Sequence, residues 1–204
     1  MADQTENSKL WQPRSVEETQ KLYADWAESY EADVTRLNYA GPARIAAVLV
    51  EHMGDKSLPI LDFGCGTGLS GQALHASGFT TIDGTDIAPE MLAQATAKGI
   101  YRRTWPGTVG EVDAAPGDYA AITATGVISL GAAPPGMLLT LLDALAPGGL
   151  LAFTYNDPTL DDPAYTTALD DLLAAGTATL LFREHGPHLS EKVTGSDVIL
   201  LRKR

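Results

Sequence analysis

The segment Ile60-Leu61-Asp62-Phe63-Gly64-Cys65-Gly66-Thr67-Gly68 is the feature that most constrains the fold of this chain. A short apolar run ends in three closely spaced glycines and passes at once into a helix-length stretch. Glycines at a strand-to-helix turn let the backbone turn tightly and bring the free N–H groups of the helix start close to a ligand. The segment therefore predicts an α/β fold with a ligand beside this turn.

Acidic residues near these glycines favour a ligand with an ammonium group and a ribose over a dinucleotide. Leu69 stands where the NAD fingerprint G-x-G-x-x-G requires its third glycine, which disfavours an NAD-dependent oxidoreductase. Asp62 lies two residues before the first glycine, where a carboxylate repels a pyrophosphate but suits an ammonium group. Asp86 follows Gly66 by 20 residues, where an acid accepts both hydroxyls of a ribose. A plain helix cap is the alternative for Asp86.

Short apolar runs alternate with amphipathic segments along the rest of the chain. We expect strands near 58–63, 80–86, 100–105, 119–127 and 149–156, and helices near 67–77, 88–98, 135–146 and 162–175. This alternation is typical of a mostly parallel sheet with helices on both faces. Two β-rich runs, 177–183 and 197–202, are joined by a polar segment without a helix, which indicates an antiparallel hairpin. The prediction is a three-layer α/β sandwich around a seven-stranded sheet.

The N-terminal part is predicted to form helices that cover the ligand. Residues 1–12 lack apolar periodicity and are expected to be a flexible tail. Ser15 and Glu18 form a plausible capping box, and Gly41-Pro42 restarts the helical pattern. We expect residues 13–55 to form a helical lid, which belongs to one structural domain with residues 56–204.

Composition restricts the partners of the chain. Its 26 acidic and 14 basic residues give a net charge of -12, which disfavours nucleic-acid and anionic-membrane partners. One cysteine excludes an internal disulfide. The N-terminal residues do not read as a signal peptide, and no apolar run reaches the length of a membrane span, so a cytoplasmic location is expected.

Three segments, LDFGCGTG, GTDIAPEML and AITATGVISL, resemble the class I S-adenosylmethionine-dependent methyltransferases over roughly residues 20–204. The segments YADWAESYEADV, NYAGP and GIYRRTW are most similar to the methyltransferase-like proteins named for the Williams–Beuren region. The resemblance implies a Rossmann-like fold, S-adenosyl-L-methionine as the cofactor, and methyl transfer to an acceptor. A small, neutral or cationic acceptor is expected from the acidic composition.

The resemblance also implies roles for residues around the glycine turn. Asp62 faces the amino group of the cofactor's methionine, while Gly64 and Gly66 line its methionine and ribose side. Asp86 holds the ribose hydroxyls, and Ile87 packs against the adenine. These roles agree with the ammonium and ribose preferences drawn from the residues themselves.

Five further residues are expected to bind the cofactor. The resemblance places Thr125 beside the methionine, and Tyr23 and Tyr30 on the lid helix, where a core role is the alternative. The acid that many relatives carry after the third strand is missing here, so Thr104 or a backbone carbonyl would contact the adenine amino group. Cys65 is expected to be a small residue under the cofactor, although its place at a helix start would lower the thiol pKa.

No catalytic residue is predicted. Positioning alone supplies much of the rate of a transfer reaction, so a general base is not obligatory. Asn156-Asp157-Pro158 is expected to be a turn, and His185 and His188 to be exposed loop residues rather than metal ligands. The function expected is methyl transfer to a small molecule. The alternative is a module that binds the cofactor without catalysis and acts as a partner or sensor.

Overall fold

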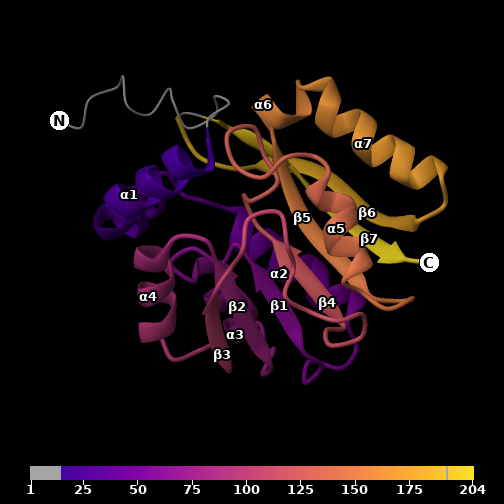
Figure 1. Ribbon diagram of the computed structural model, residues 1–204, viewed down its shortest axis with the longest axis horizontal. Helices are drawn as coiled ribbons and strands as arrows, with labels where there is room; N and C mark the ends of the chain where they lie inside the picture. The colour runs from indigo at the N-terminus through magenta and orange to yellow at the C-terminus, as the bar shows by residue number, and fades with distance from the viewer. Residues whose placement is uncertain (1–14, 192) are drawn as a thin grey trace.

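The structure, a computed structural model, describes residues 15–191 and 193–204 (Figure 1). The tail predicted for residues 1–12 lies outside this range. The elements, in chain order, are α1 (Val16–Arg36), α2 (Gly41–His52), β1 (Ile60–Phe63), α3 (Leu69–Ala76), β2 (Ile82–Asp86), α4 (Pro89–Ala97), β3 (Arg103–Pro106), β4 (Ala121–Ala124), α5 (Met137–Asp143), β5 (Leu150–Asn156), α6 (Asp157–Leu160), α7 (Pro163–Ala174), β6 (Ala178–Pro187) and β7 (Gly195–Lys203).

The sheet confirms the predicted fold class. Its seven strands run in the order β3-β2-β1-β4-β5-β7-β6. Strands β1 to β5 pair in parallel, whereas β7 is antiparallel to both β5 and β6. The strand order reverses between β1 and β4, and open sheets of this kind bind their ligands beside such a reversal, at the carboxyl ends of the strands.

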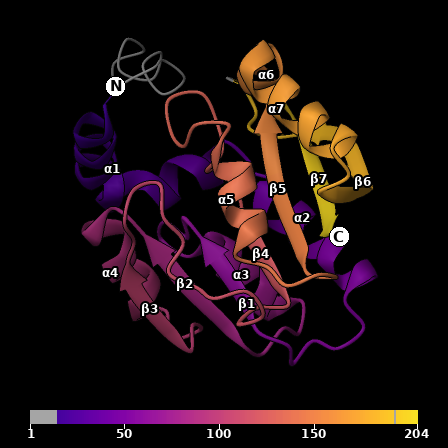
Figure 2. The ribbon, with the colours of Figure 1, turned by 45° about the vertical axis from the view of Figure 1, so that its right-hand side comes forward.

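The sheet is the middle layer of three, with helices on both of its faces (Figures 1 and 2), and buried side chains pack between the layers. Helices α5 and α7 cover one face, where Leu61, Ile122 and Phe153 are fully buried. Helices α2 and α3 cover the other face, where Ile60 and Ile82 are fully buried. The central strands β1, β2, β4 and β5 are buried on both sides because helices cover both faces, whereas the edge strands β3 and β6 are partly exposed.

Helix α1 differs from the other helices because it lies across the loops that follow β2 and β4 (Figure 2). Its Ser15–Glu18 capping box is present as predicted. Thr19 donates a hydrogen bond to the carbonyl of Gly131, and Gln20 donates one to the carbonyl of Ile87. Helix α2, in contrast, contributes to the core against the sheet. Within residues 13–55, therefore, α1 is the helix that lies over the carboxyl edge.

Two predicted segments differ from the structure. The segment Asn156-Asp157-Pro158 starts a short helix instead of a turn, because the Asn156 side chain accepts a hydrogen bond from the Thr159 backbone N–H. The hairpin strands also extend beyond the predicted ranges, to Pro187 in β6 and from Gly195 in β7. The added residues are polar or small, and His185 among them contacts Asp197, so the apolar pattern did not reveal the extension.

Candidate functional site

Two adjoining cavities lie at the carboxyl edge of the sheet, beside the reversal of strand order. The larger has a volume of about 230 Å³ and the smaller about 30 Å³. Four residues line both cavities and form the junction between them: Tyr30, Gly64, Gly66 and Thr125. Six of the predicted cofactor residues line the larger cavity besides Thr125: Tyr23, Tyr30, Gly64, Gly66, Asp86 and Ile87.

The glycine turn between β1 and α3 forms the shared floor of the cavities. Gly64 has a φ of 66°, and a Cβ there would lie 2.4 Å from a methyl group of Val127. Gly66 has a φ of 54°, and a Cβ there would meet no atom within 4 Å. Gly64 therefore permits close packing against the loop after β4, whereas Gly66 leaves its backbone open to the cavities.

Asp86, the last residue of β2, is fixed by the backbone on both sides. Its Oδ2 accepts a hydrogen bond from Gly66 N at 2.8 Å, and its Oδ1 accepts one from Ala88 N at 2.8 Å. Burial raises the pKa of this carboxyl, and the backbone N–H groups oppose that rise. Since each carboxylate oxygen can accept a second hydrogen bond, Asp86 can still receive ligand hydroxyls in the larger cavity.

Asp62 lies beneath the cavities and lines neither of them. It is fully buried, and its Oδ2 accepts hydrogen bonds from the hydroxyls of Ser70 and Tyr101, at 2.6 and 2.7 Å. Its Oδ1 accepts one from Thr123 at 2.9 Å. Burial raises the pKa of this carboxyl, whereas the three hydroxyl donors lower it. Ser70 also lines the smaller cavity, so it connects that cavity with Asp62.

The thiol of Cys65 is less acidic than the sequence predicts. The side chain is 4% exposed, and burial raises the pKa of the thiol, which Asp62 and Asp86 raise further. Helix α3 starts only at Leu69, so the helix terminus does not offset this burial. Cys65 lines the smaller cavity and packs close to Gly84, as a small residue in that position would. The expectation of a lowered pKa was wrong.

Three tyrosines surround the cavities. Tyr23 and Tyr30 come from α1, and Tyr39 comes from the turn between α1 and α2. Tyr23 lines the larger cavity, Tyr39 the smaller and Tyr30 both. Burial raises the pKa of Tyr30 and Tyr39 well above the ordinary value, so both hydroxyls stay protonated at neutral pH. Sequence analysis missed Tyr39, although it lies within the NYAGP segment that resembles relatives.

Two threonine hydroxyls need hydrogen-bond partners. The Oγ1 atoms of Thr67 and Thr125 are buried and have no partner in the described part of the chain. Both residues line the smaller cavity. Buried polar groups are nearly always hydrogen-bonded, so these hydroxyls fit a polar ligand. An amino-acid end in the smaller cavity and a nucleoside in the larger match the groups present, which therefore fit S-adenosylmethionine.

Thr104 lies apart from these groups. Its hydroxyl is 2.7 Å from that of Thr96, and Thr104 lines neither cavity. The chain after β3 lines the larger cavity with residues 107–110 instead, and Phe63, Met91 and Met137 add further apolar wall that sequence analysis missed. These apolar residues read as ordinary core positions in the sequence, so no signal separated them from the core.

The histidines of the C-terminal part differ from each other. His185 lies in β6 with a side chain that is 58% exposed, whereas His188 is only 5% exposed. The expectation that His188 is an exposed loop residue was wrong, because the α1–α2 turn covers it. Within residues 15–191 and 193–204, no three His, Cys, Asp or Glu side chains are arranged to hold a metal ion.

Comparison with known proteins identifies the family. The chain matches the family model of a methyltransferase domain over residues 30–193. It is 36% identical over 141 residues to Methyltransferase-like protein 27 of Homo sapiens, and the match covers 66% of this chain and 57% of the human protein. The chain thus spans little more than half the length of that relative.

Solved structures share the fold at low identity. Magnesium protoporphyrin IX methyltransferase of Synechocystis PCC 6803, with bound S-adenosylmethionine, has a TM-score of 0.67 at 15% identity, covering 91% of this chain and 97% of that one. A TehB-like S-adenosylmethionine-dependent methyltransferase of Corynebacterium glutamicum has a TM-score of 0.61 at 20% identity, covering 87% and 98%. The chain belongs to the methyltransferase domain family and has the fold of the S-adenosylmethionine-dependent methyltransferases.

Proposed function

We propose that this protein transfers a methyl group from S-adenosylmethionine to a small, neutral or cationic molecule. The observation that carries the proposal is the pair of cavities joined at Tyr30, Gly64, Gly66 and Thr125. The cofactor has a nucleoside at one end, an amino acid at the other and a sulfur between them. A cofactor that spans both cavities therefore has its sulfur at the junction.

The larger cavity would hold the adenosine. Asp86 keeps free lone pairs for the two ribose hydroxyls, while the backbone N–H groups of Gly66 and Ala88 fix its orientation. Ile87 and Met91 offer apolar surface to the adenine, and residues 107–110 lie along the same cavity. Thr104 lies outside this cavity, so residues 107–110 are better placed to contact the adenine amino group.

The smaller cavity would hold the methionine end. The unpartnered hydroxyls of Thr67 and Thr125 would bind its polar groups. Asp62 contributes a negative charge below the cavity, close to Ser70. A positively charged ammonium group is favoured near such a charge even without direct contact, because the buried setting screens the field weakly. This is how we expect Asp62 to act on the cofactor.

When bound, S-adenosylmethionine supplies a methyl group on a positively charged sulfur, which a lone pair of the acceptor displaces. The residues of this chain would hold both reactants in line, and such positioning supplies much of the rate of a transfer reaction. Helix α1 would exclude water, since Tyr23 and Tyr30 line the cavities from the lid side.

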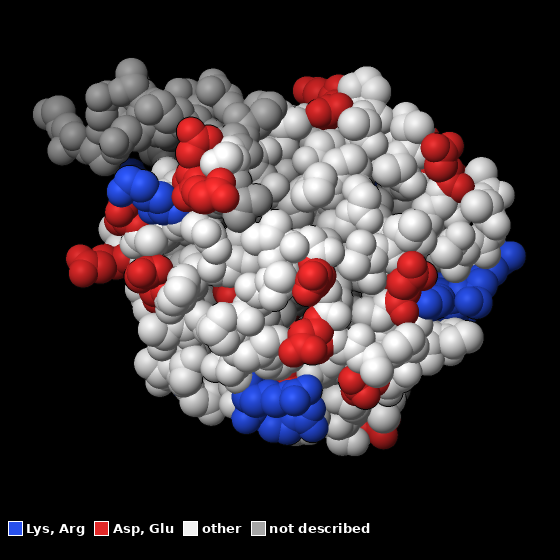
Figure 3. All heavy atoms as spheres, viewed as in Figure 1, with Lys and Arg blue, Asp and Glu red and all other residues white. Residues whose placement is uncertain are grey.

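The walls of the site indicate the acceptor class. Among the described residues that line the two cavities, Asp86 is the only carboxylate, and no Lys, Arg or His is present. An anionic acceptor would therefore meet no opposite charge there. Acidic side chains are scattered over the face in Figure 3, and basic ones gather in a few places. The net charge of -12 further disfavours a nucleic-acid acceptor.

None of the helices in the described part has the length and apolarity of a membrane span.

Calorimetric titration with S-adenosylmethionine and S-adenosylhomocysteine tests the cofactor. Binding of both by the folded protein is expected. In a separate thermal-shift assay, NAD should not raise the melting temperature of the protein. The absence of binding at high micromolar cofactor would contradict the proposal. The titration requires no knowledge of the acceptor.

A module that binds the cofactor without catalysis is the second candidate. The observation in its favour is that no described residue lining the cavities is a ready general base, because Asp86 is engaged by the backbone. Release of S-adenosylhomocysteine across a panel of small amines, thiols and phenols separates the two candidates. Binding without any release would favour the silent module.

A further inference from the structure

Tyr39 lies at the edge of the junction. Its ring lines the smaller cavity, and its hydroxyl approaches Gly126, which lines the larger one. A Cβ at Gly126 would lie 2.8 Å from Tyr39 Oη. Tyr39 therefore lies next to both cavities and closes the junction between them, near the end of β4. No hydrogen bond to Tyr39 Oη is present within residues 15–191 and 193–204.

The ring of His188 packs against the ring of Tyr39. The two rings meet edge to face, with centroids 5.2 Å apart and planes at 84°. His188 is 5% exposed, and its Nδ1 has no hydrogen-bond partner among the described residues. Burial lowers the pKa of His188 to about 4, so the ring is neutral at neutral pH. The imidazole thus serves Tyr39 as an uncharged packing surface.

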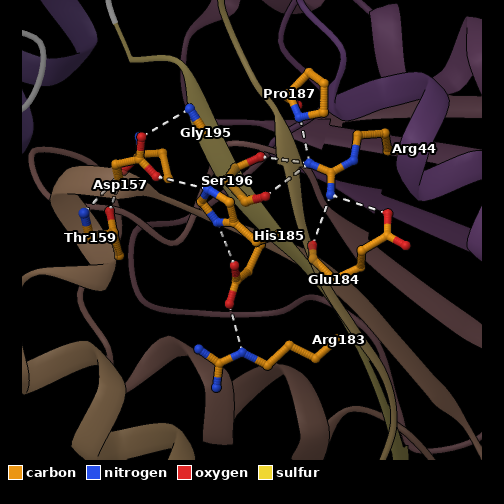
Figure 4. A network of polar contacts seen from close by, with 11 residues as sticks. Arg44, Asp157, Thr159, Arg183, Glu184, His185, Pro187, Gly195 and Ser196 are labelled. Carbon is orange, nitrogen blue, oxygen red and sulfur yellow. Dashed lines mark hydrogen bonds and ion pairs between the residues drawn. The ribbon is translucent and has the colours of Figure 1, made fainter.

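The connection that carries His188 is fixed to the α1–α2 turn. Ala40 N donates a hydrogen bond to His188 O at 2.9 Å, and Ser190 N donates one to Leu37 O at 2.7 Å. The guanidinium of Arg44 donates to the carbonyls of Glu184 and Pro187 and to Ser196 (Figure 4). These bonds join segments that are about 150 residues apart, so Tyr39 and His188 hold a defined mutual position.

Figure 4 also shows the polar contacts that hold the β6–β7 hairpin against the start of α6. Asp157, at the start of α6, accepts a hydrogen bond from Gly195 N at 2.9 Å. His185 lies between two carboxylates, with Nδ1 2.9 Å from Asp197 Oδ1 and Nε2 3.6 Å from Asp157 Oδ1. The network ties β6 and β7 to the end of β5, and it therefore supports the position of His188.

We infer that Tyr39 contacts the reacting atom of the methyl acceptor, and that His188 is a positioning residue that holds the Tyr39 ring. The inference rests on the proposed function, because the cofactor sulfur must lie at the junction. Sulfur carries three substituents, and the adenosine and methionine chains lead into the two cavities. In this arrangement the third, the methyl group, would face the side that Tyr39 closes, since Tyr39 Oη lies beside Gly126 at the edge of the junction.

The chemistry of Tyr39 defines an acceptor class. A neutral phenol can accept a hydrogen bond from an N–H, O–H or S–H group and so aim the lone pair of that atom at the methyl carbon. The lone pair forms the new bond to the methyl carbon, the electron pair of the C–S bond goes to sulfur, and the acceptor's proton passes to solvent. The acceptor is therefore an uncharged amine, alcohol, phenol or thiol with a hydrogen on its reacting atom.

Three ligands that share the adenosine and amino-acid ends but differ at the central sulfur position test the inference without a known acceptor. S-adenosylmethionine carries a methyl group on a positively charged sulfur, S-adenosylhomocysteine has an uncharged sulfur with no methyl group, and sinefungin has a carbon that bears an amine in place of the sulfur and its methyl group. Tyr39→Phe should weaken sinefungin about tenfold, because the amine loses its hydrogen bond to the phenol, and should change the other two affinities less than twofold. Tyr155→Phe is the matched control, since Tyr155 Oη is also buried but lines neither cavity.

Each other result overturns the inference. Equal weakening of all three ligands would place Tyr39 on the methionine end, and unchanged affinities would remove it from the site. Failure of the wild type to bind sinefungin while it binds the other two would show that no group faces the transferred position. Failure to bind any of the three would instead contradict the proposed function, and the inference would fall with it.

Two variants test the role of His188. His188→Ala removes the support of the Tyr39 ring and should lower sinefungin affinity severalfold, with little effect on S-adenosylhomocysteine. His188→Phe keeps the edge-to-face contact and should restore sinefungin binding. If both variants bind sinefungin as the wild type does, His188 does not position Tyr39. If His188→Phe matches His188→Ala, an imidazole nitrogen is required and packing is not its role.

Discussion

The two sides of the site are built in opposite ways. On the glycine-turn side, formed by β1, β2 and the helices that follow them, the key contacts join nearby residues: Gly66 and Asp86 are 20 positions apart, and Asp62 and Tyr101 are 39. On the acceptor side, formed by the α1–α2 turn and the β6–β7 connection, Leu37 and Ser190 are 153 positions apart. The proposed cofactor side is thus held by contacts between residues up to 61 positions apart, and the proposed acceptor side by contacts between residues about 150 positions apart.

The two sides also differ in charge. Asp62 and Asp86 place two carboxylates at the glycine-turn side, and burial raises the pKa of each. The acceptor side presents Tyr39 and His188, which are both neutral at neutral pH. The cofactor carries a positive sulfur and an ammonium group, so negative charge belongs on its side. An uncharged wall opposite the methyl group suits a neutral nucleophile.

Loss of Asp62 should have the largest effect on stability. Asp62→Ala removes the acceptor of three buried hydroxyl donors, those of Ser70, Tyr101 and Thr123. Leaving such groups unpaired should lower the free energy of unfolding by about 3 kcal/mol. Urea unfolding measures the loss. Asp161→Ala, at an exposed acid, is the control and should leave the unfolding midpoint unchanged.

The same experiment on the acceptor side would sharpen the contrast. His188→Phe should alter the free energy of unfolding at neutral pH far less than Asp62→Ala, because the imidazole Nδ1 has no partner to lose. Equal losses in the two variants would contradict the view that the glycine-turn side is held by a buried charge and the acceptor side by packing.

The same contrast explains what sequence could and could not predict. The glycine spacing and Asp86 pointed to the edge of the sheet where the cavities lie, because residues 20 positions apart make the contact there. The parallel strands and the three layers followed from the alternation of strands and helices, whereas the strand order is known only from the structure. Tyr39 and the burial of His188 were missed because they depend on two segments that meet only in the folded chain. The predicted direction of the Cys65 thiol pKa was wrong because the sequence did not show that the side chain is buried near two acids and that the helix starts only at Leu69.

Loss of Asp86 should affect cofactor binding and spare the acceptor side. Asp86→Ala removes the ribose acceptor and the partner of Gly66 N, so affinity for S-adenosylmethionine should fall by about 2 kcal/mol, roughly 30-fold. Asp86→Asn keeps one oxygen and should lose less. Calorimetry measures both, and Tyr39→Phe, whose S-adenosylmethionine affinity should not change, is the comparison. An unchanged affinity in a folded Asp86→Ala protein would refute the ribose role.

The smallest effect expected is a pH dependence that belongs to the acceptor side. The folded pKa of His188 is about 4, below the ordinary 6.5, since burial and Arg44 lower it more than Asp157 raises it, while the neighbouring Tyr39 stays neutral. The unfolded chain therefore takes up a proton below pH 6.5 that the folded protein takes up only near pH 4. The contribution of His188 therefore lowers the free energy of unfolding by about 1 kcal/mol as the pH falls from 7.5 to 5.5.

Urea unfolding of wild type and His188→Phe at those two pH values isolates this contribution. Asp62 and Asp86 act in the opposite direction, because a raised carboxyl pKa stabilises the fold as the pH falls. Both proteins contain these acids, so their effect cancels in the difference. The wild type should lose about 1 kcal/mol more than the variant. Equal losses would mean that folded His188 already carries a proton at pH 5.5, and the acceptor side would then present a cation beside Tyr39 instead of a neutral wall.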